Sequence, residues 1–509
     1  MVITGQIRTE VSWVTPVFKI SLLLVCPLLL WGAILPENLA STAGMVQHFL
    51  QDAFGWFYLL SVSGLVLCCI YLIFSRYGDV PLGPDDAKPE FKLVTWFAML
   101  FCAGMGIGLV FWGVAEPNHH YYEPPTGPGE TPEAARLALR YSFYHWGLHP
   151  WAIYAVVGLC LAYFQFRRQA PGLISQSCQP LFGKHTNGPV GYGIDTLAVL
   201  ATLFGVATSL GFGAIQITGG LSYLSGIPNT FFTQLAVVIV VTALFMVSAQ
   251  TGLHRGIKYL SNLNIVLASS LLLFLLCLGP TTFIMDAFTS TLGSYLQNLP
   301  VMSLNLKPFE DATWIHDWTL FYWAWWIAWA PFVGMFIARI SKGRTLREFV
   351  LGVLLVPTIF CAFWFSVFGG TTISLEMFDH VSLKQVIDTQ GKEVALFTLL
   401  GHFPLGAFMS ILAMFLIGTF FITSADSATF VLGTLTSDGN LNPPNSIKFT
   451  WGIIQSLTAL VLLWTGGLQA LRTASIIAAF PFAFVIIIMV IALFKALQKD
   501  MQTSRLSDR

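Results

Sequence analysis

The segment from Trp318 to Arg347 reads WTLFYWAWWIAWAPFVGMFIARISKGRTLR. It is long and apolar enough to cross a bilayer, and a basic cluster closes it. Aromatic side chains recur along one helical face at steps of four, three and four, as Trp318, Tyr322, Trp325 and Trp329. Pro331 and Gly334 follow at once, so we expect the helix to be kinked or broken just after the aromatics. An aromatic wall beside a broken membrane helix predicts a binding site for an organic cation.

The composition is typical of a helical membrane protein. Of the 509 residues, 55% are hydrophobic and only 10% are charged, and the mean hydropathy is +0.72. Soluble domains carry roughly 25% charged residues, so the charged fraction is less than half of the usual value. The formal net charge is zero, which gives no reason to expect a nucleic-acid partner. The eight cysteines lie almost entirely in apolar runs without metal-ligand spacing, and we interpret them as packing residues.

Apolar runs of about 20 residues recur along the chain, so the sequence predicts an all-α polytopic membrane protein with twelve transmembrane helices. Most of the 25 Lys and Arg residues fall on the side of the membrane that holds both termini. The positive-inside rule therefore predicts that both termini are cytoplasmic. The predicted spans are 14–35, 54–74, 94–115, 141–164, 192–222, 231–249, 259–279, 317–339, 349–370, 403–432, 447–464 and 471–495.

Two of these spans contain helix breakers near mid-membrane. The third reads FCAGMGIGLVFWG, with Gly104, Gly106 and Gly108 at every second position, and the eighth carries Pro331 and Gly334. The alternative for the glycines is close helix packing alone, but packing motifs of small residues recur every four residues rather than every two. The breakers lie five spans apart, which is typical of inverted-repeat transporters with unwound helices. The spacing predicts two five-helix repeats, spans 3–7 and 8–12.

The prediction divides the chain into a membrane domain and short flanking parts. After the seventh span, TTFIMDAFTSTLGSYLQNL is expected to form an amphipathic helix along the outer interface. The expected parts are a short cytoplasmic tail (1–13), two peripheral helices (14–93), the first repeat (94–279), the amphipathic helix with its loop (280–316), the second repeat (317–495) and a short cytoplasmic tail (496–509).

The fourth span supplies a second aromatic set, which consists of Tyr144, Trp146, Trp151 and Tyr154. Single Trp and Tyr residues in membrane proteins often form an interfacial belt, which is the alternative to a site. A quaternary ammonium group has no hydrogen-bond donor, and aromatic faces attract it by about 0.5–2 kcal/mol each. No Asp or Glu falls within the stripe of the eighth span. That absence favours a zwitterion, or a cation whose charge is met by aromatic rings alone.

The tenth span contains the polar segment FFITSADSATF. Hydroxyl groups of Thr423 and Ser424 are hard oxygen ligands suited to Na⁺, but they can also bond the carbonyl one turn earlier, and taken alone this second interpretation is favoured. Asp426 is a functional candidate because it is ionisable at membrane depth, although pairing with a basic loop residue is an equal alternative. We expect His145 and His149 to form hydrogen bonds within the helical bundle rather than to act as ligands.

Four motifs together resemble the betaine/choline/carnitine transporter family, and the resemblance extends over almost the whole chain. It implies a LeuT-like inverted repeat, a homotrimer in the inner membrane and alternating access to a membrane-embedded site. A membrane enzyme or an ion channel is disfavoured, since the spans contain no catalytic pair and no symmetric filter motif. The motifs are GMGIGLVFWGVAEP (104–117), HWGLHPWAIY (145–154), the 318–347 segment and FFITSADSA (420–428).

The resemblance also implies roles for particular residues. The substrate site would consist of an aromatic box with two glycines whose backbone meets a carboxylate: Trp325, Trp326, Trp329, Trp146, Trp151, Tyr154, Gly106 and Gly108. An outer aromatic patch would consist of Trp318, Phe321 and Trp323. A sodium site would take backbone carbonyls and hydroxyls from Cys102, Met105, Phe420, Thr423 and Ser424. A second sodium site would use Thr202 and Phe332, although Val206 stands where betaine members carry a second threonine.

Gly108 bears on the choice of substrate. Proton-coupled choline members of the family carry Asp at the position of Gly108, so the glycine favours sodium coupling and a betaine-like substrate. The sequence thus predicts Na⁺-coupled uptake of glycine betaine or a similar quaternary ammonium osmolyte, with membrane lipids as surroundings and no cofactor other than the coupling ion. Uptake of choline or carnitine, with protons as another coupling ion, is the alternative.

Overall fold

The computed structural model describes residues 14–104, 106–251 and 254–507, and within these ranges the regular structure is helical. An isolated bridge between Pro81 and Thr345 is the one extended pairing found there. Ten helices of the described chain are long and apolar enough to cross a membrane. The prediction of an all-helical polytopic membrane protein is therefore confirmed.

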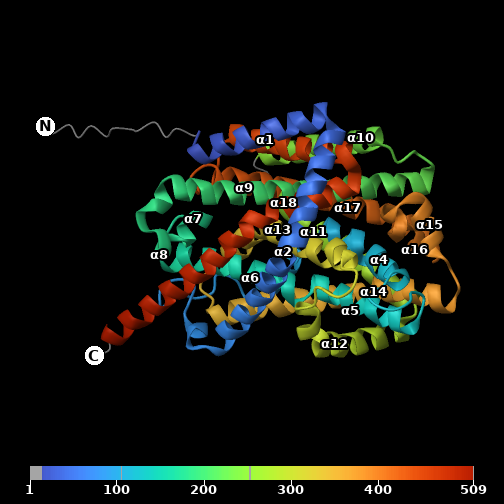
Figure 1. Ribbon diagram of the computed structural model, residues 1–509, viewed down its shortest axis with the longest axis horizontal. Coiled ribbons are helices and arrows are strands. Elements are labelled where there is room, and N and C mark those ends of the chain that lie inside the picture. Colours follow the sequence, from blue (N-terminus) through green and yellow to red (C-terminus); the bar gives the residue numbers. More distant parts are fainter. Residues whose placement is uncertain (1–13, 105, 252–253, 508–509) are drawn as a thin grey trace.

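The helices are labelled in Figure 1 and coloured along the chain. The first half contains α1 (Pro16–Ile34), α2 (Pro36–Phe74), η1 (Arg76–Asp79), α3 (Leu93–Gly104), α4 (Ile107–Tyr122), α5 (Pro132–Trp146), α6 (Leu148–Ala162), η2 (Tyr163–Arg167), α7 (Ile174–Ser177), α8 (Gln179–Phe182), η3 (Gly183–Asn187), α9 (Pro189–Ser225) and α10 (Phe231–Thr251). The second half contains α11 (His254–Leu278), α12 (Thr281–Ser303), η4 (Ile315–Leu320), α13 (Phe321–Ile340), α14 (Leu346–Phe378), α15 (Leu383–Gln390), η5 (Lys392–Val394), α16 (Ala395–Gly401), α17 (Gly406–Leu435) and α18 (Asn445–Ser507).

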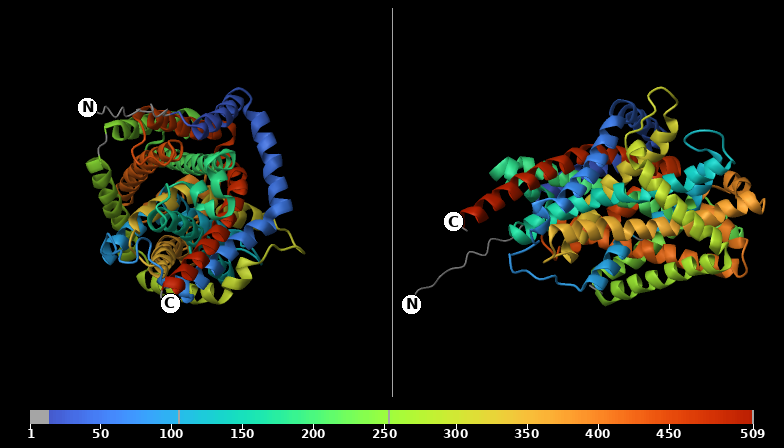
Figure 2. Two further views of the ribbon diagram at one scale, coloured as in Figure 1. Left: turned by 90° about the vertical axis from the view of Figure 1, so that its left-hand side faces the viewer. Right: turned by 90° about the horizontal axis from the view of Figure 1, so that it is seen from below.

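Most long helices run along the long axis of the molecule (Figure 1). The start of α1 and the end of α18 lie toward one end, together with α7 and α8, while α15 and α16 lie at the opposite end (Figures 1 and 2). Helix α13, which carries the aromatic stripe apart from Trp318 in η4, packs against α6, α9 and α18. The stripe is therefore surrounded by protein rather than by lipid.

The expected break in the third span is confirmed. Helix α3 ends at Gly104 and α4 begins at Ile107, with Gly106 extended at φ −164° and ψ −179°. A Cβ atom at Gly106 would meet no atom within 4 Å, so this glycine does not serve a close helix contact. The carbonyl of Gly106 accepts hydrogen bonds from the backbone nitrogens of Leu109 and Val110, so Gly106 caps α4, and the first N–H groups of that helix are the ones left free to line a site.

Of the expected kink or break in the eighth span, the break is wrong, because α13 continues through Pro331 and Gly334 to Ile340. Gly334 serves close packing instead. A Cβ atom there would lie 2.7 Å from Cγ1 of Val157 and 3.2 Å from the backbone nitrogen of Gly158 in α6. A proline removes one helical hydrogen bond, and tight packing by neighbouring helices can hold the remaining turns together.

Two further interruptions shape the bundle. The predicted fourth span is divided at Gly147, which has φ −98° and ψ −131° and separates α5 from α6. A Cβ atom at Gly147 would lie 2.8 Å from the hydroxyl of Tyr295, which accepts a hydrogen bond from the freed backbone nitrogen of Leu148. In α18 the backbone is non-helical at Gly466 and Gly467, between the expected spans 447–464 and 471–495. The predicted amphipathic segment forms α12.

Candidate functional site

The residues predicted for the substrate site lie together. They line one small cavity of about 30 Å³ between α4, α5, α6 and α13. That volume is close to the space of one water molecule, so the rings have closed on one another. The predicted residues in its wall are Gly106, Gly108, Trp146, Trp151, Tyr154, Trp325, Trp326 and Trp329, and Leu109, Pro150, Ser209 and Cys361 complete it.

The rings of this aromatic box meet in regular aromatic geometry. Trp325 and Trp326 are stacked with centroids 4.8 Å apart and planes 19° from parallel. Trp146 meets Trp326 edge-on at 4.8 Å, and Trp151 meets Tyr154 edge-on at 5.5 Å. Offset stacks and edge contacts are the favoured arrangements of aromatic pairs, so the closed box is a stable packing unit.

Hydrogen bonds hold some of these rings and leave others with open donors. Trp326 donates from Nε1 to the carbonyl of His145 at 2.9 Å, and Trp329 donates to the carbonyl of Gly205 at 2.6 Å. The indole nitrogen of Trp325 and the hydroxyl of Tyr154 are buried, and no partner for them occurs in the described chain. Buried donors are nearly always satisfied in proteins, so these two are suited to a polar group of a ligand.

Gly108 lets the box close. A Cβ atom at this position would lie 2.4 Å from Cη2 of Trp325 and 3.3 Å from Cη2 of Trp146. A carbon atom at 2.4 Å overlaps the indole, so any side chain here would push Trp325 aside. The residue that the sequence related to substrate choice is thus in contact with the box.

Glu116 is the functional candidate that sequence reasoning missed. Its side chain is fully buried and accepts hydrogen bonds from Trp146 Nε1 at 2.9 Å and from the hydroxyl of Tyr322 at 2.5 Å. Nδ1 of His145 lies 2.7 Å from the same carboxylate, and Nε2 of His120 lies at 3.3 Å. The eighth span has no acid within its stripe, where Asp317 only precedes Trp318, but α4 brings one to the rings. A glutamate inside the apolar run GVAEP was the signal that could have revealed this.

The histidines of this region form hydrogen bonds, as expected. His145 Nε2 lies 3.0 Å from Oγ1 of Thr319, and His149 Nε2 lies 2.9 Å from Oγ of Ser303. Ligand atoms of Glu116, His120 and His145 all lie within 4.8 Å of one another, which is close enough for one metal ion. The carboxylate already receives donors on both oxygens, so it is satisfied by hydrogen bonds, whereas Nδ1 of His120 is buried without a partner among the described residues.

The structure keeps two members of the predicted outer aromatic patch, Trp318 and Phe321, together against Trp112 and separates Trp323 from them. Phe321 stacks on Trp325 at 5.7 Å with planes 13° apart, so it lies next to the box. Trp318 meets Trp112 edge-on at 5.4 Å. Trp323 stacks on His149 at 5.1 Å and is completely buried, which places it away from any lipid interface.

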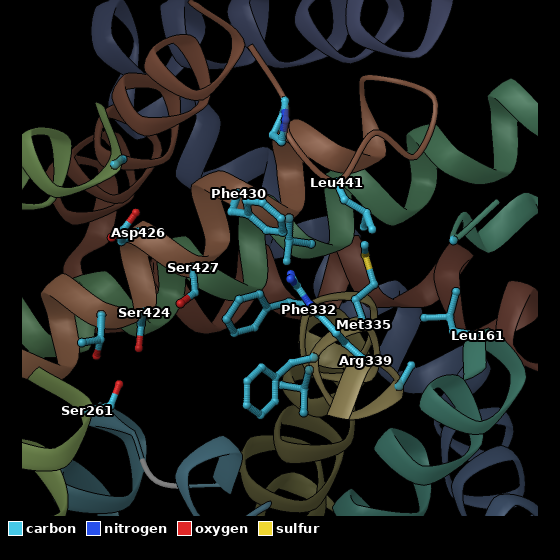
Figure 3. Close-up of a pocket in the computed structure, with 18 of the residues that line it drawn as sticks. Leu161, Ser261, Phe332, Met335, Arg339, Ser424, Asp426, Ser427, Phe430 and Leu441 are labelled. Carbon is cyan, nitrogen blue, oxygen red and sulfur yellow. The ribbon is translucent and has the colours of Figure 1, made fainter. Parts of the chain in front are cut away.

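A second cavity of about 740 Å³ continues from the box toward the basic end of α13. Trp329 lines both cavities and therefore stands between them. Figure 3 shows Ser424 and Ser427 of α17 across this cavity from Phe332, Met335 and Arg339 of α13. Asp426 also lines it and accepts a hydrogen bond of 2.7 Å from Ser248.

The structure describes only some of the predicted sodium ligands. Phe420, Thr423 and Ser424 line the large cavity. The hydroxyl of Thr423 lies 2.9 Å from the carbonyl of Thr419, the intrahelical bond that was the alternative interpretation. The side chain of Cys102 and all of Met105 lie outside the described residues.

The second predicted sodium site has one open ligand. Oγ1 of Thr202 is buried and has no hydrogen-bond partner in the described chain, so a hard oxygen atom is free there. Phe332, its predicted companion, lines the large cavity. An unsatisfied hydroxyl oxygen fits a cation that prefers oxygen ligands.

Comparison with known proteins agrees with this geometry. A family model described as betaine/carnitine/choline family transporter matches residues 16–502. The chain is 54% identical to the glycine betaine transporter OpuD of Bacillus subtilis over 96% of this chain and 95% of the relative. It is 45% identical to the ectoine/hydroxyectoine transporter of Virgibacillus pantothenticus over 95% and 96% of the two chains. It is 38% identical to the osmo-dependent choline transporter BetT2 of Acinetobacter baylyi over 95% of this chain and 71% of that relative. The chain therefore belongs to the betaine/carnitine/choline family of transporters, and it is a multi-pass membrane transporter rather than an enzyme.

Proposed function

We propose that this protein imports glycine betaine, or a closely similar methylated zwitterion, by symport with Na⁺. The observation that carries the proposal is the gathering of the six aromatic residues of the box around one cavity that Gly106 and Gly108 also line. The 54% identity to a glycine betaine transporter supports the same substrate class.

The box suits a trimethylammonium group. Each aromatic face attracts such a group by about 0.5–2 kcal/mol, and more when water is excluded. Glu116 lies directly behind Trp146 and adds a buried negative charge to the attraction. Gly106 caps the start of α4, so the first N–H groups of that helix are available for the carboxylate of the substrate.

The helix pattern supports alternating access. We count α3 with α4 as one broken span and α18 as two spans, which with the remaining nine candidate helices makes twelve. Spans 3–7 and 8–12 would then form the inverted repeats of a LeuT-like fold. We further propose a homotrimer in the inner membrane with both termini in the cytoplasm. In that orientation the large cavity opens toward the cytoplasm beside Arg339, Lys342 and Lys448, so the conformation is inward-facing.

Sodium coupling rests on oxygen ligands beside the substrate path. Thr423 and Ser424 line the cavity, and Thr202 offers a buried hydroxyl without a partner in the described residues. Each Na⁺ that enters down a potential of 100 mV supplies about 2.3 kcal/mol from voltage alone. One or two ions would therefore drive marked accumulation of substrate.

Choline uptake is the second candidate function. The aromatic box accepts any trimethylammonium group, and one relative is an osmo-dependent choline transporter. Gly108 argues against it. The resemblance implies an Asp at this position in proton-coupled choline members, and an Asp side chain here would have to displace Trp325.

Uptake into proteoliposomes tests the proposal. Radiolabelled glycine betaine should accumulate with external Na⁺ and not when K⁺ replaces it, and excess choline should compete weakly. Trp326→Leu should abolish uptake, whereas the matched variant Trp464→Leu at an exposed site should retain it. Undiminished uptake in K⁺ would sink the coupling claim, and stronger uptake of choline than of betaine would favour the second candidate.

A further inference from the structure

A buried arginine covers the aromatic residues next to the box. The guanidinium of Arg472, in α18, lies 4.5 Å from the ring centroid of Phe321 and 5.6 Å from that of Trp318. Arg472 is only 9% exposed, and its Nε and Nη2 atoms have no hydrogen-bond partner among the described residues. Cation–π contacts therefore take the place of the hydrogen bonds that a buried guanidinium normally makes.

A second cation shares the same indole. The ammonium group of Lys392, at the start of η5, lies 5.1 Å from the ring centroid of Trp318. Burial, with the nearby charge of Arg472, lowers the pKa of Lys392 to about 8. In the part of the chain that the structure describes, no ion pair joins either cation to a carboxylate within 4.0 Å.

This arrangement is electrostatically incomplete. Two like charges beside one ring repel each other, and unsatisfied donors on a buried charged group carry a large desolvation cost. The charge of Asp317 acts on both cations from a distance without an ion pair to either among the described residues, and an anion between the two cations would relieve both the repulsion and the desolvation cost. A guanidinium with two open N–H groups is the side chain best matched to a planar carboxylate.

We infer that Arg472 and Lys392 form a recognition site for the carboxylate of a zwitterionic substrate on its way to the aromatic box. The inference rests on the proposed function and deepens it, because it names a group that separates zwitterions from choline. Phe321 stacks on Trp325, so a carboxylate bound at Arg472 lies one ring away from the box. The guanidinium leaves the face of Phe321 for the carboxylate, and the trimethylammonium group takes the vacated face.

The site distinguishes substrates by their charge pattern. Glycine betaine carries both the ammonium and the carboxylate, whereas choline carries a hydroxyl group in place of the acid. Loss of the charged hydrogen bond from Arg472 therefore weakens the binding of betaine and leaves the binding of choline unchanged. Chloride offers the same negative charge without an ammonium group, so a chloride-free medium separates a substrate subsite from a general anion site.

The test compares full-length wild type, Arg472→Gln and Arg472→Lys in proteoliposomes, with Arg140→Gln as the matched control. Arg140 is a partly buried arginine of α5 that donates to Ser294 and makes no cation–π contact with Phe321 or Trp318. The KM for radiolabelled betaine and the inhibition constant of choline are measured in chloride and in gluconate media. Arg472→Gln should raise the KM for betaine by about tenfold or more and change the choline constant less than about twofold. The betaine KM of Arg472→Lys should lie between those of wild type and Arg472→Gln, and both constants of Arg140→Gln should match wild type.

Each other outcome has a definite meaning. Equal losses for betaine and choline, with a normal size-exclusion profile, would show that Arg472 only supports the fold of the path and would overturn the inference. An unchanged betaine KM would overturn it as well, and so would a chloride dependence that Arg472→Gln abolishes without altering the betaine-to-choline ratio. If wild type itself neither transports betaine nor binds choline, the proposed function fails first and the inference fails with it.

Discussion

The indole nitrogen of Trp146 donates a 2.9 Å hydrogen bond to the carboxylate of Glu116, and both side chains are buried. This contact joins an aromatic face of the predicted cation box to a negative charge from a different helix. Tyr322, on the stripe of α13, donates to the same carboxylate oxygen. One acid thus orients rings from two aromatic sets and adds its charge behind them, so it acts on both the shape and the potential of the box.

Replacement of Glu116 by Gln should weaken substrate binding while largely keeping the shape of the site. The charge is lost, and an amide nitrogen faces donors that need an acceptor. We expect the KM for betaine to rise about tenfold, because a charged hydrogen bond contributes about 1.5–3 kcal/mol. Uptake kinetics in proteoliposomes measure this change. Glu133→Gln is the control, since Glu133 is exposed and pairs with Arg136. An unaltered KM would mean that the carboxylate has no influence on the box.

A methyl group at Gly108 should disturb the box more than one elsewhere in the bundle. The new Cβ would lie 2.4 Å from Trp325, and overpacking of this kind costs about 1–3 kcal/mol. Gly108→Ala should therefore lower the thermal unfolding temperature and raise the betaine KM. Gly370→Ala serves as control, because a Cβ there meets no atom within 4 Å. Equal effects of the two variants would contradict the contact between Gly108 and Trp325 as a determinant of function.

Thr202→Val should separate ion binding from stability. The hydroxyl of Thr202 has no hydrogen-bond partner within the described chain, so its loss should leave the unfolding temperature unchanged or slightly higher. If the oxygen binds Na⁺, the Na⁺ concentration for half-maximal uptake should rise several-fold, and Thr202→Ser should restore it. Thr358→Val removes another buried hydroxyl without a partner among the described residues and should leave the Na⁺ dependence intact. A normal Na⁺ curve for Thr202→Val would remove this residue from the ion site.

External pH should modulate betaine affinity through Lys392. Its pKa of about 8 lies below the ordinary value of 10.5, so burial opposes the charged form. The ammonium is present below pH 8 and is lost as the pH rises through 8, so the carboxylate should bind more weakly at pH 9 than at pH 7. The same shift means that Lys392 lowers the free energy of unfolding most below pH 8, and that this penalty is relieved between pH 8 and 10.5.

The charged neighbours of Lys392 should not produce this dependence. They are Arg472, His119, His120, Asp317, Glu123 and Asp388. Carboxylates stay ionised and the guanidinium stays protonated over this range. Burial lowers the pKa of His119 and His120, so both imidazoles are neutral throughout it. Uptake measured from pH 7 to 9 should show the loss in wild type and a flatter profile in Lys392→Arg. A dependence that persists in Lys392→Arg would assign it to another group.

Local sequence patterns predicted much of the box and little of its surroundings. The steps of four, three and four placed Trp325 and Trp329 on one face, because helical periodicity is a local property. Gly106 was predicted to be unwound for the same local reason. The interruption at Gly147 was not predicted, since it depends on the hydroxyl of Tyr295 from a distant helix. Pro331 was predicted to break its helix, but contacts with neighbouring helices keep that helix continuous.

The sequence by itself determined the class of the molecule, the positions of its apolar helices and the aromatic faces that could meet a cation, because hydropathy and period are written into consecutive residues. Only the tertiary structure decided which polar groups would reach those faces. Glu116 lies 206 positions from Tyr322 along the chain and is hydrogen-bonded to it, and Arg472 covers Phe321 from 151 positions further along the chain. A charge buried in a membrane protein must be met by another group, and the packing of the whole bundle determines which group that is.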